Sequence, residues 1–192
     1  MSGLETDPVL SFTTAKGWEA WLAKHHGDGT GAWLRIFKKD SGQKTVTPSD
    51  ALDVALCYGW IDGLKRSYDE VSFVQRYSPR TARSGWSKIN TARVERLIEA
   101  NRMTAAGLRV VEAARSDGRW ARAYEGSANA SAPDDFLRRL KKDKEAYAFF
   151  ETLSRANLYA IVYRLSTAKK AETRERWMTR ILEMLAKRET FH

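Results

Sequence analysis

The sequence predicts an α+β protein in which a small antiparallel sheet with flanking helices is followed by a helical C-terminal part. Apolar and polar residues alternate in two short runs within residues 60–77, which is typical of paired strands. Apolar residues between 136 and 185 recur instead at spacings of three and four, which is typical of helices. With 192 residues, 43% of them hydrophobic, the chain can bury a sizeable core.

The N-terminal part begins with a predicted helix that Thr14 caps and whose apolar residues fall on one side. The glycine-rich residues 25–31 end it. Residues 32–39 predict a strand with apolar side chains on both faces. Thr47, which precedes a proline, predicts the start of a second helix, and Gly59 ends that helix.

Two antiparallel strands are then expected at residues 60–65 and 71–77, and Pro79 ends the sheet because proline cannot donate to a strand ladder. Helical periodicity resumes from Ser87 and again from Thr104. The α+β part therefore closes with two helices.

Residues 125–135 are small, polar and proline-containing, which indicates a linker. We therefore predict an α+β domain at 1–125 and a helical region at 126–192. The net charge is +9, and residues 138–188 carry fourteen Lys and Arg against six Asp and Glu. A basic face there would attract nucleic acid, phosphorylated metabolites or an anionic membrane surface, while the alternative is a solvated helical face.

The composition argues against several classes of protein. The single cysteine, Cys57, excludes an internal disulfide and is expected to be an inert core thiol. The three histidines, His25, His26 and His192, lack metal-ligand spacing, and no phosphate-binding glycine loop is present, so neither a metal nor a cofactor is predicted. The N-terminus lacks a secretory signal and no apolar run approaches the roughly 20 residues of a membrane span, so a cytoplasmic protein is expected.

The run from Cys57 to Asn90 combines aromatic, cationic and turn residues more densely than a fold requires. Guanidinium groups suit carboxylate or phosphate, aromatic faces suit a flat ring, and a helix start at Ser87 would offer backbone N–H groups to an anion. The predicted ligand-binding residues are Trp60, Asp62, Arg76, Tyr77, Arg80, Trp86, Ser87, Lys88 and Asn90. The alternative is structural: the tryptophans anchor the core, Asp62 holds Arg76 or Arg80, and Ser87 caps a helix.

Five motifs carry a resemblance to a known family. They are ALCYGWIDG, QRYSPR, SGWSKIN, GRW and LSRANLYAIVYRLSTAKKAETRERW. In this order they resemble the YdeI or OmpD-associated (OmdA-like) family, also called bacteriocin-protection proteins, over almost the whole chain. The resemblance implies a bacterial cytoplasmic protein associated with tolerance of bacteriocins or antimicrobial peptides. It implies no reaction, cofactor or catalytic residue.

Three function hypotheses follow. The first is a binding or regulatory module for a small anionic or aromatic ligand, associated with bacteriocin or antimicrobial stress tolerance. The second is a nucleic-acid-binding protein that uses basic and aromatic residues, which a steep dependence on salt would reveal. The third is an enzyme built around Asp62 and Arg76 or Arg80, although no catalytic motif is recognisable. The sequence leaves the oligomeric state open.

Overall fold

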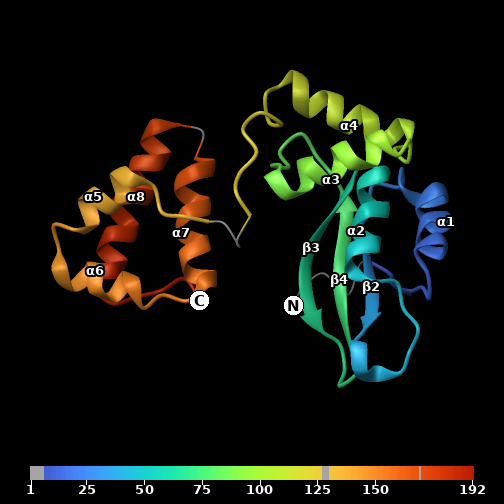
Figure 1. The fold of residues 1–192 in the computed structure, drawn as a ribbon, viewed down its shortest axis with the longest axis horizontal. Helices are drawn as coiled ribbons and strands as arrows, with labels where there is room; N and C mark the ends of the chain where they lie inside the picture. Colours follow the sequence, from blue (N-terminus) through green and yellow to red (C-terminus); the bar gives the residue numbers. More distant parts are fainter. Residues whose placement is uncertain (1–6, 127–129, 169) are drawn as a thin grey trace. The chain divides into compact units, whose positions relative to one another are not determined.

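The computed structural model describes residues 7–126, 130–168 and 170–192. The chain divides into two compact units, Met1–Trp86 with Asn90–Arg122 and Ser87–Ile89 with Ala123–His192. The first is α+β and the second is helical, so the predicted fold class is confirmed (Figure 1). The domain boundary predicted between residues 125 and 126 stays a prediction.

The elements up to residue 116 form the sheet and its helices. They are β1 (Val9–Ser11), α1 (Ala15–His25), β2 (Ala32–Phe37), the 3₁₀ helix η1 (Lys39–Ser41), α2 (Pro48–Cys57), β3 (Trp60–Ser67), β4 (Ser72–Pro79), α3 (Lys88–Glu99) and α4 (Ala105–Ser116). The helix caps follow the sequence. Thr14 accepts a hydrogen bond from the backbone N–H of Gly17, and Thr47 accepts one from that of Asp50.

The sheet has the strand order β1-β2-β4-β3. The predicted hairpin is confirmed, because β3 and β4 pair antiparallel, and β4 also pairs antiparallel with β2. The register shifts between Asp62 and Lys65, a stretch that contains Gly63, and a glycine inside a strand often marks such an irregularity. The three-residue β1, which the sequence did not predict, pairs parallel with β2 and makes the sheet mixed.

Helices α1 and α2 cover one face of the sheet and form the core of the first unit with it (Figure 1). Trp18 and Leu22 come from α1, and Val54 comes from α2. They pack against Leu34 and Ile36, which share one face of β2. Helices α3 and α4 lie at the end of the sheet where β3 begins and β4 ends (Figure 1). That end of the sheet carries the candidate site.

The second unit contains four helices among its described residues. They are α5 (Asp134–Leu140), α6 (Lys144–Glu151), α7 (Arg155–Thr167) and α8 (Ala171–Ala186). Phe136, Leu140, Ile161, Ile181 and Leu185 lie in its separate core. As predicted, the helical periodicity of this part places these residues inside.

Two further sequence predictions concern the connection and the membrane. Residues 127–129 of the linker predicted at 125–135 lie outside the described residues, and α5 already begins at Asp134. Among the described helices, none combines the length and apolar character that a bilayer span requires.

Candidate anion-binding site

Helix α4 is docked onto the C-terminal end of α2. The backbone N–H and the Oγ1 hydroxyl of Thr104 both donate to the carbonyl oxygen of Cys57, at 3.1 and 2.7 Å. Those bonds satisfy a carbonyl that the end of α2 would otherwise leave without a partner. At Gly107 the backbones approach so closely that a Cβ atom would lie 2.2 Å from the same carbonyl oxygen. This approach therefore requires glycine.

A second glycine shapes the turn from α2 into β3. Gly59 has a φ of +76°, a conformation that glycine adopts readily and other residues rarely adopt. A Cβ atom there would lie 2.8 Å from Cγ2 of Val110. The start of β3 and the side of α4 therefore meet closely, and a cavity opens beside them.

The cavity has a volume of about 390 Å³, which is within the range of small-molecule sites. Its apolar wall includes Ala106, Val110 and Ala113, which follow one face of α4. The lining also includes Arg109 on the same helix, and His26, Tyr58, Trp60, Arg80 and Arg119 from other elements. No Asp or Glu contributes to the lining formed by the described residues. The cavity therefore has a positively charged and an apolar part.

Arg80 follows directly after β4 and is buried, with 8% of its surface exposed. Its guanidinium carbon lies 3.6 Å from the centre of the Trp86 ring, and its Nη1 donates to the carbonyl oxygen of Gly85 at 2.9 Å. Trp86 in turn packs against Trp120, with ring centres 4.8 Å apart. The aromatic pair holds the guanidinium in one position while leaving its charge beside the cavity.

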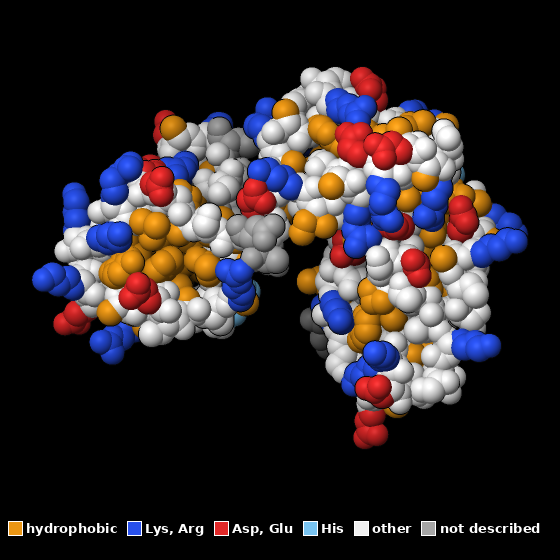
Figure 2. Space-filling view, viewed as in Figure 1, with side chains coloured by type: hydrophobic (Ala, Val, Ile, Leu, Met, Phe, Trp, Pro, Cys, Tyr) orange, Lys and Arg blue, Asp and Glu red, His pale blue; other side chains and the backbone are white. Residues whose placement is uncertain are grey.

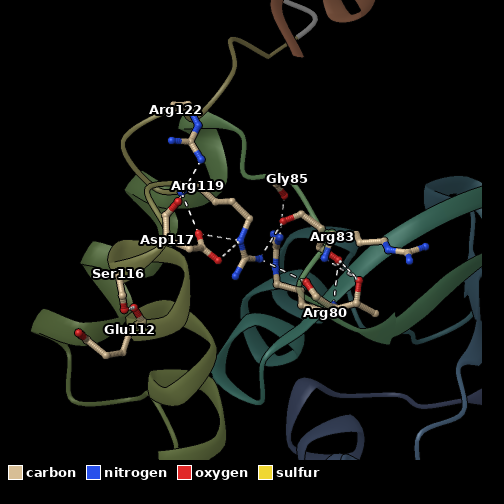
Figure 3. Close-up of polar contacts among 10 residues, drawn as sticks. Arg80, Arg83, Gly85, Glu112, Ser116, Asp117, Arg119 and Arg122 are labelled. Atoms are coloured by element: carbon tan, nitrogen blue, oxygen red, sulfur yellow. Dashed lines mark hydrogen bonds and ion pairs between the residues drawn. The ribbon is translucent and has the colours of Figure 1, made fainter. Parts of the chain in front are cut away.

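Arg119 braces the loop that follows Arg80. Its Nη1 donates to the carbonyl oxygens of Thr81 and Ser84, at 3.2 and 3.1 Å, and its Nε donates to the carboxylate of Asp117. Figure 3 shows the Arg119 guanidinium between Asp117 and this loop. Arg80 and Arg119 are thus both fixed to carbonyls of residues 81–85.

Arg109 on α4 differs from these two arginines. It is exposed, and its side chain makes no ion pair or hydrogen bond with any residue that the structure describes. Its five N–H donors are therefore available to a ligand.

His26 and Trp60 connect the cavity to the core. Trp60 is 1% exposed and its Nε1 donates to the carbonyl oxygen of His26 at 3.0 Å. The Nδ1 atom of His26 lies 3.0 Å from the carbonyl oxygen of Leu22, so we assign the ring hydrogen to Nδ1. Nε2 then accepts a hydrogen bond when the ring is neutral and donates one when it is protonated.

Of the nine predicted ligand-binding residues, Trp60 and Arg80 line the cavity. Arg76 instead pairs with Asp7, its Nε lying 2.7 Å from Oδ2. Tyr77 lies in the core. Its burial raises the pKa of its hydroxyl, and the nearby Asp62 carboxylate raises this pKa further. Neighbouring residues on β4 point to opposite faces of the sheet, so Arg76 and Tyr77 lie on opposite faces, and as ligand contacts they stay predictions.

Asp62 lies opposite Tyr77 in the pairing of β3 with β4 and does not line the cavity. Burial raises the pKa of its carboxyl group, whereas the charge of Arg80 opposes that rise. Because Asp62 shares the face of Tyr77, Arg76 points away from it, and the suggested pair of Asp62 with Arg76 is wrong.

The four remaining predicted residues contribute no lining to the cavity. Trp86 supports Arg80, as described above. Ser87 and Lys88 belong to the second unit, where Ser87 bridges to Tyr124 and the Lys88 ammonium pairs with Glu125. Asn90 belongs to the first unit and is half-buried on α3. As ligand contacts, these residues stay predictions.

Sequence reasoning missed His26, Tyr58, Arg109 and Arg119. One usable signal exists for Arg109, because it lies three residues after Ala106 and four before Ala113, a spacing that places all three on one helix face. The contribution of α4 depends on its docking to α2, which no local pattern reveals.

Two other groups of the first unit that could have served chemistry, Asp53 and Cys57, are held in structural contacts or buried. The buried Asp53 accepts hydrogen bonds from Arg93 and Arg96, at 2.7 and 2.6 Å, and ties α2 to α3. Burial raises the pKa of the Cys57 thiol to about 11, which keeps it protonated at neutral pH. Within the described ranges, no three His, Cys, Asp or Glu residues are grouped as metal ligands.

The fold and the cavity define an α+β protein with a candidate site for a small anion, joined to a helical unit. Residues 10–110 match the family model described as a domain of unknown function, DUF8412, and because this match spans more than half of the chain, the chain belongs to that family. Residues 129–188 match the family described as bacteriocin-protection, YdeI or OmpD-associated.

The predicted resemblance is thus confirmed for residues 129–188. Three of the motifs on which it was based, ALCYGWIDG, QRYSPR and SGWSKIN, fall within the DUF8412 match instead. No curated protein and no solved structure matches the chain.

Proposed function

We propose that the first unit binds a small anionic ligand in the cavity beside α4. The observation that carries this proposal is the convergence of Arg80, Arg109 and Arg119 on one cavity whose described lining contains no carboxylate. A ligand that supplies negative charge there would form charge-assisted hydrogen bonds in a partly dehydrated site, where they are stronger than in open water.

The two fixed arginines support binding rather than general solubility. Arg80 exposes only 8% of its residue surface, and Arg119 exposes only 10% of its side-chain surface. Burying a guanidinium costs free energy, and arginines that serve solubility remain in water. Because ring and carbonyl contacts hold both groups in place, little side-chain entropy is lost when an anion binds.

The family of residues 129–188 carries the name bacteriocin-protection, and we place the anion site within such a tolerance role. Direct capture of a cationic peptide fits poorly, since a net charge of +9 repels it at long range. A small anion, by contrast, is attracted by the same charge.

The test is a titration of the full chain with benzoate, phenyl phosphate and sulfate, followed by calorimetry and by thermal unfolding. We expect saturable binding of one ligand per chain by at least one of these anions. Arg109→Gln should weaken that binding by roughly 10-fold or more, the worth of a hydrogen bond to a charged group. Arg83→Gln is the matched control, because Arg83 is an exposed arginine of the neighbouring loop that does not line the cavity.

Equal losses in both variants, or no saturable binding, would contradict the cavity as the site. The nucleic-acid alternative predicts instead that oligonucleotides bind with a steep salt dependence. The charges give it limited support: the first unit has 18 Lys and Arg against 14 Asp and Glu, and the second has 15 against 10. On the face shown in Figure 2, acidic side chains are interspersed with basic ones over both units.

A further inference from the structure

We infer that the ligand of the cavity is a phosphate monoester with an apolar body rather than a carboxylate. This inference rests on the proposed function and deepens it, because it names the chemical class of the anion and the part of the cavity that each half of the ligand contacts.

The first step is the number of hydrogen-bond donors. Arg119 uses Nε and Nη1 on Asp117 and on loop carbonyls, while its Nη2 makes no hydrogen bond with any described residue. The whole guanidinium of Arg109 is available as well. Together they offer more N–H groups than the two oxygens of a carboxylate require, whereas a phosphate monoester presents three terminal oxygens.

The second step is charge. Three guanidinium groups line the cavity, whereas no carboxylate of a described residue does. A phosphate monoester carries about −1.5 to −2 at neutral pH, and a carboxylate carries −1. The larger charge therefore matches the lining better.

The third step is the apolar wall. Ala106, Val110 and Ala113 present methyl groups along α4, and Gly59, which lies against Val110, adds no side chain to the lining. Inorganic phosphate would leave this wall in contact with water, whereas a ring or alkyl group would cover it and gain the free energy of apolar burial. Tyr58 adds an aromatic surface to the same cavity.

The experiment compares three probes by calorimetry on the full chain: phenyl phosphate, benzoate and inorganic phosphate. Phenyl phosphate and benzoate share the ring and differ in the anion, whereas phenyl phosphate and inorganic phosphate share the anion and differ in the ring. We expect phenyl phosphate to bind tightest, by roughly 10-fold over each of the other two, as extra charge-assisted contacts and ring burial predict.

Two variants assign the halves of the ligand. Arg109→Gln should weaken phenyl phosphate more than benzoate. Ala113→Phe should fill the apolar wall and weaken phenyl phosphate while leaving inorganic phosphate unchanged. Ala113 is exposed on α4, so the larger side chain does not disturb the core. Arg83→Gln again serves as the control and should change none of the three affinities.

Benzoate binding as tightly as phenyl phosphate, with the same sensitivity to Arg109→Gln, would overturn the phosphate assignment and keep the anion site. Unchanged phenyl phosphate binding in Ala113→Phe would overturn the apolar contact. If none of the three probes binds, the proposed function fails together with this inference. If benzoate binds as tightly as phenyl phosphate, only this inference fails, so the two failures are distinguishable.

Discussion

The two buried arginines beside the cavity in the first unit and the two arginines that join α5 to α8 in the second have different surroundings. In the first unit, Arg80 lies on the Trp86 ring and Arg119 holds loop carbonyls, both beside a cavity. In the second unit, two ion pairs join α5 to α8. Nη1 of Arg174 lies 2.6 Å from a carboxylate oxygen of Asp135, and Arg139 pairs with Glu175.

This difference shows that an excess of basic residues does not by itself locate a binding site. The sequence places its densest basic stretch at residues 138–188, yet Arg139 and Arg174 of that stretch are neutralised by carboxylates of the facing helix. The cavity draws on arginines that are far apart in sequence and are brought together by α4. A binding site therefore depends on how charges are paired as well as on how many there are.

The largest expected effect comes from Gly107→Ala, which tests whether the docking of α4 creates the cavity. The new Cβ would meet the Cys57 carbonyl at 2.2 Å, so a backbone must move. Overpacking of this kind typically costs about 1–3 kcal/mol, although alanine favours a helix by about 1 kcal/mol over glycine. We expect a lower free energy of unfolding in urea and weaker anion binding.

Gly17→Ala in α1 is the matched control for Gly107→Ala. Its Cβ would lie 3.2 Å from the Phe12 ring, which is a side chain that can adjust. It should therefore leave the free energy of unfolding unchanged or slightly higher. Equal destabilisation by both substitutions would contradict the special role of the α4 contact.

Much of the fold was predictable because its signals are local. Thr14 and Thr47 cap helices as expected, and alternation of side chains predicted the hairpin of β3 and β4. The parallel β1 escaped prediction because three residues carry no periodicity, and its partner is distant in sequence.

The candidate site was less predictable than the fold. Arg80 and Trp60 were identified because they lie in one dense segment, whereas Arg119 and His26 come from elements that meet only in the folded unit. Strand alternation alone could have separated Arg76 from Tyr77, because adjacent residues on a strand face opposite sides.

In the second unit a buried amide has a purely internal role. Oδ1 of Asn157 accepts hydrogen bonds from the backbone N–H groups of Phe191 and His192, at 3.1 and 3.0 Å. The Phe191 ring then packs against Trp177, and the Arg164 guanidinium lies 3.9 Å from the centre of the Phe191 ring. One side chain thereby fixes the segment that follows α8.

We expect Asn157→Ala to lower the free energy of unfolding by about 1–2 kcal/mol, the range for removing a partner from buried polar groups. Amide hydrogen exchange at Phe191 and His192 should accelerate. Anion binding should not change, which would separate this residue from Arg109. Unchanged amide exchange at Phe191 and His192 in Asn157→Ala would contradict the role of Asn157 in holding this segment.

The smallest expected effect concerns the ion pair between Asp135 and Arg174. Hydrogen bonding by Arg174 lowers the pKa of Asp135 to about 2, from an ordinary value of 3.8. Because the folded pKa lies below the unfolded one, the pair stabilises the protein above about pH 4 and loses this contribution as the pH falls toward 2. Since both side chains are partly exposed, the contribution is about 0.5 kcal/mol at neutral pH.

Arg174→Gln removes the effect of Arg174 on Asp135 and its weaker effect on the neighbouring Glu175, while carboxylates away from Arg174 titrate equally in both proteins. The difference in free energy of unfolding between the original chain and the variant should be present at pH 6 and shrink toward pH 2, as measured by urea unfolding. A difference that stays constant across this range would mean that Arg174 stabilises α8 by packing rather than by charge. In that case the contrast between ion-paired arginines in the second unit and cavity-lining arginines in the first would rest on Arg139 and Glu175 alone.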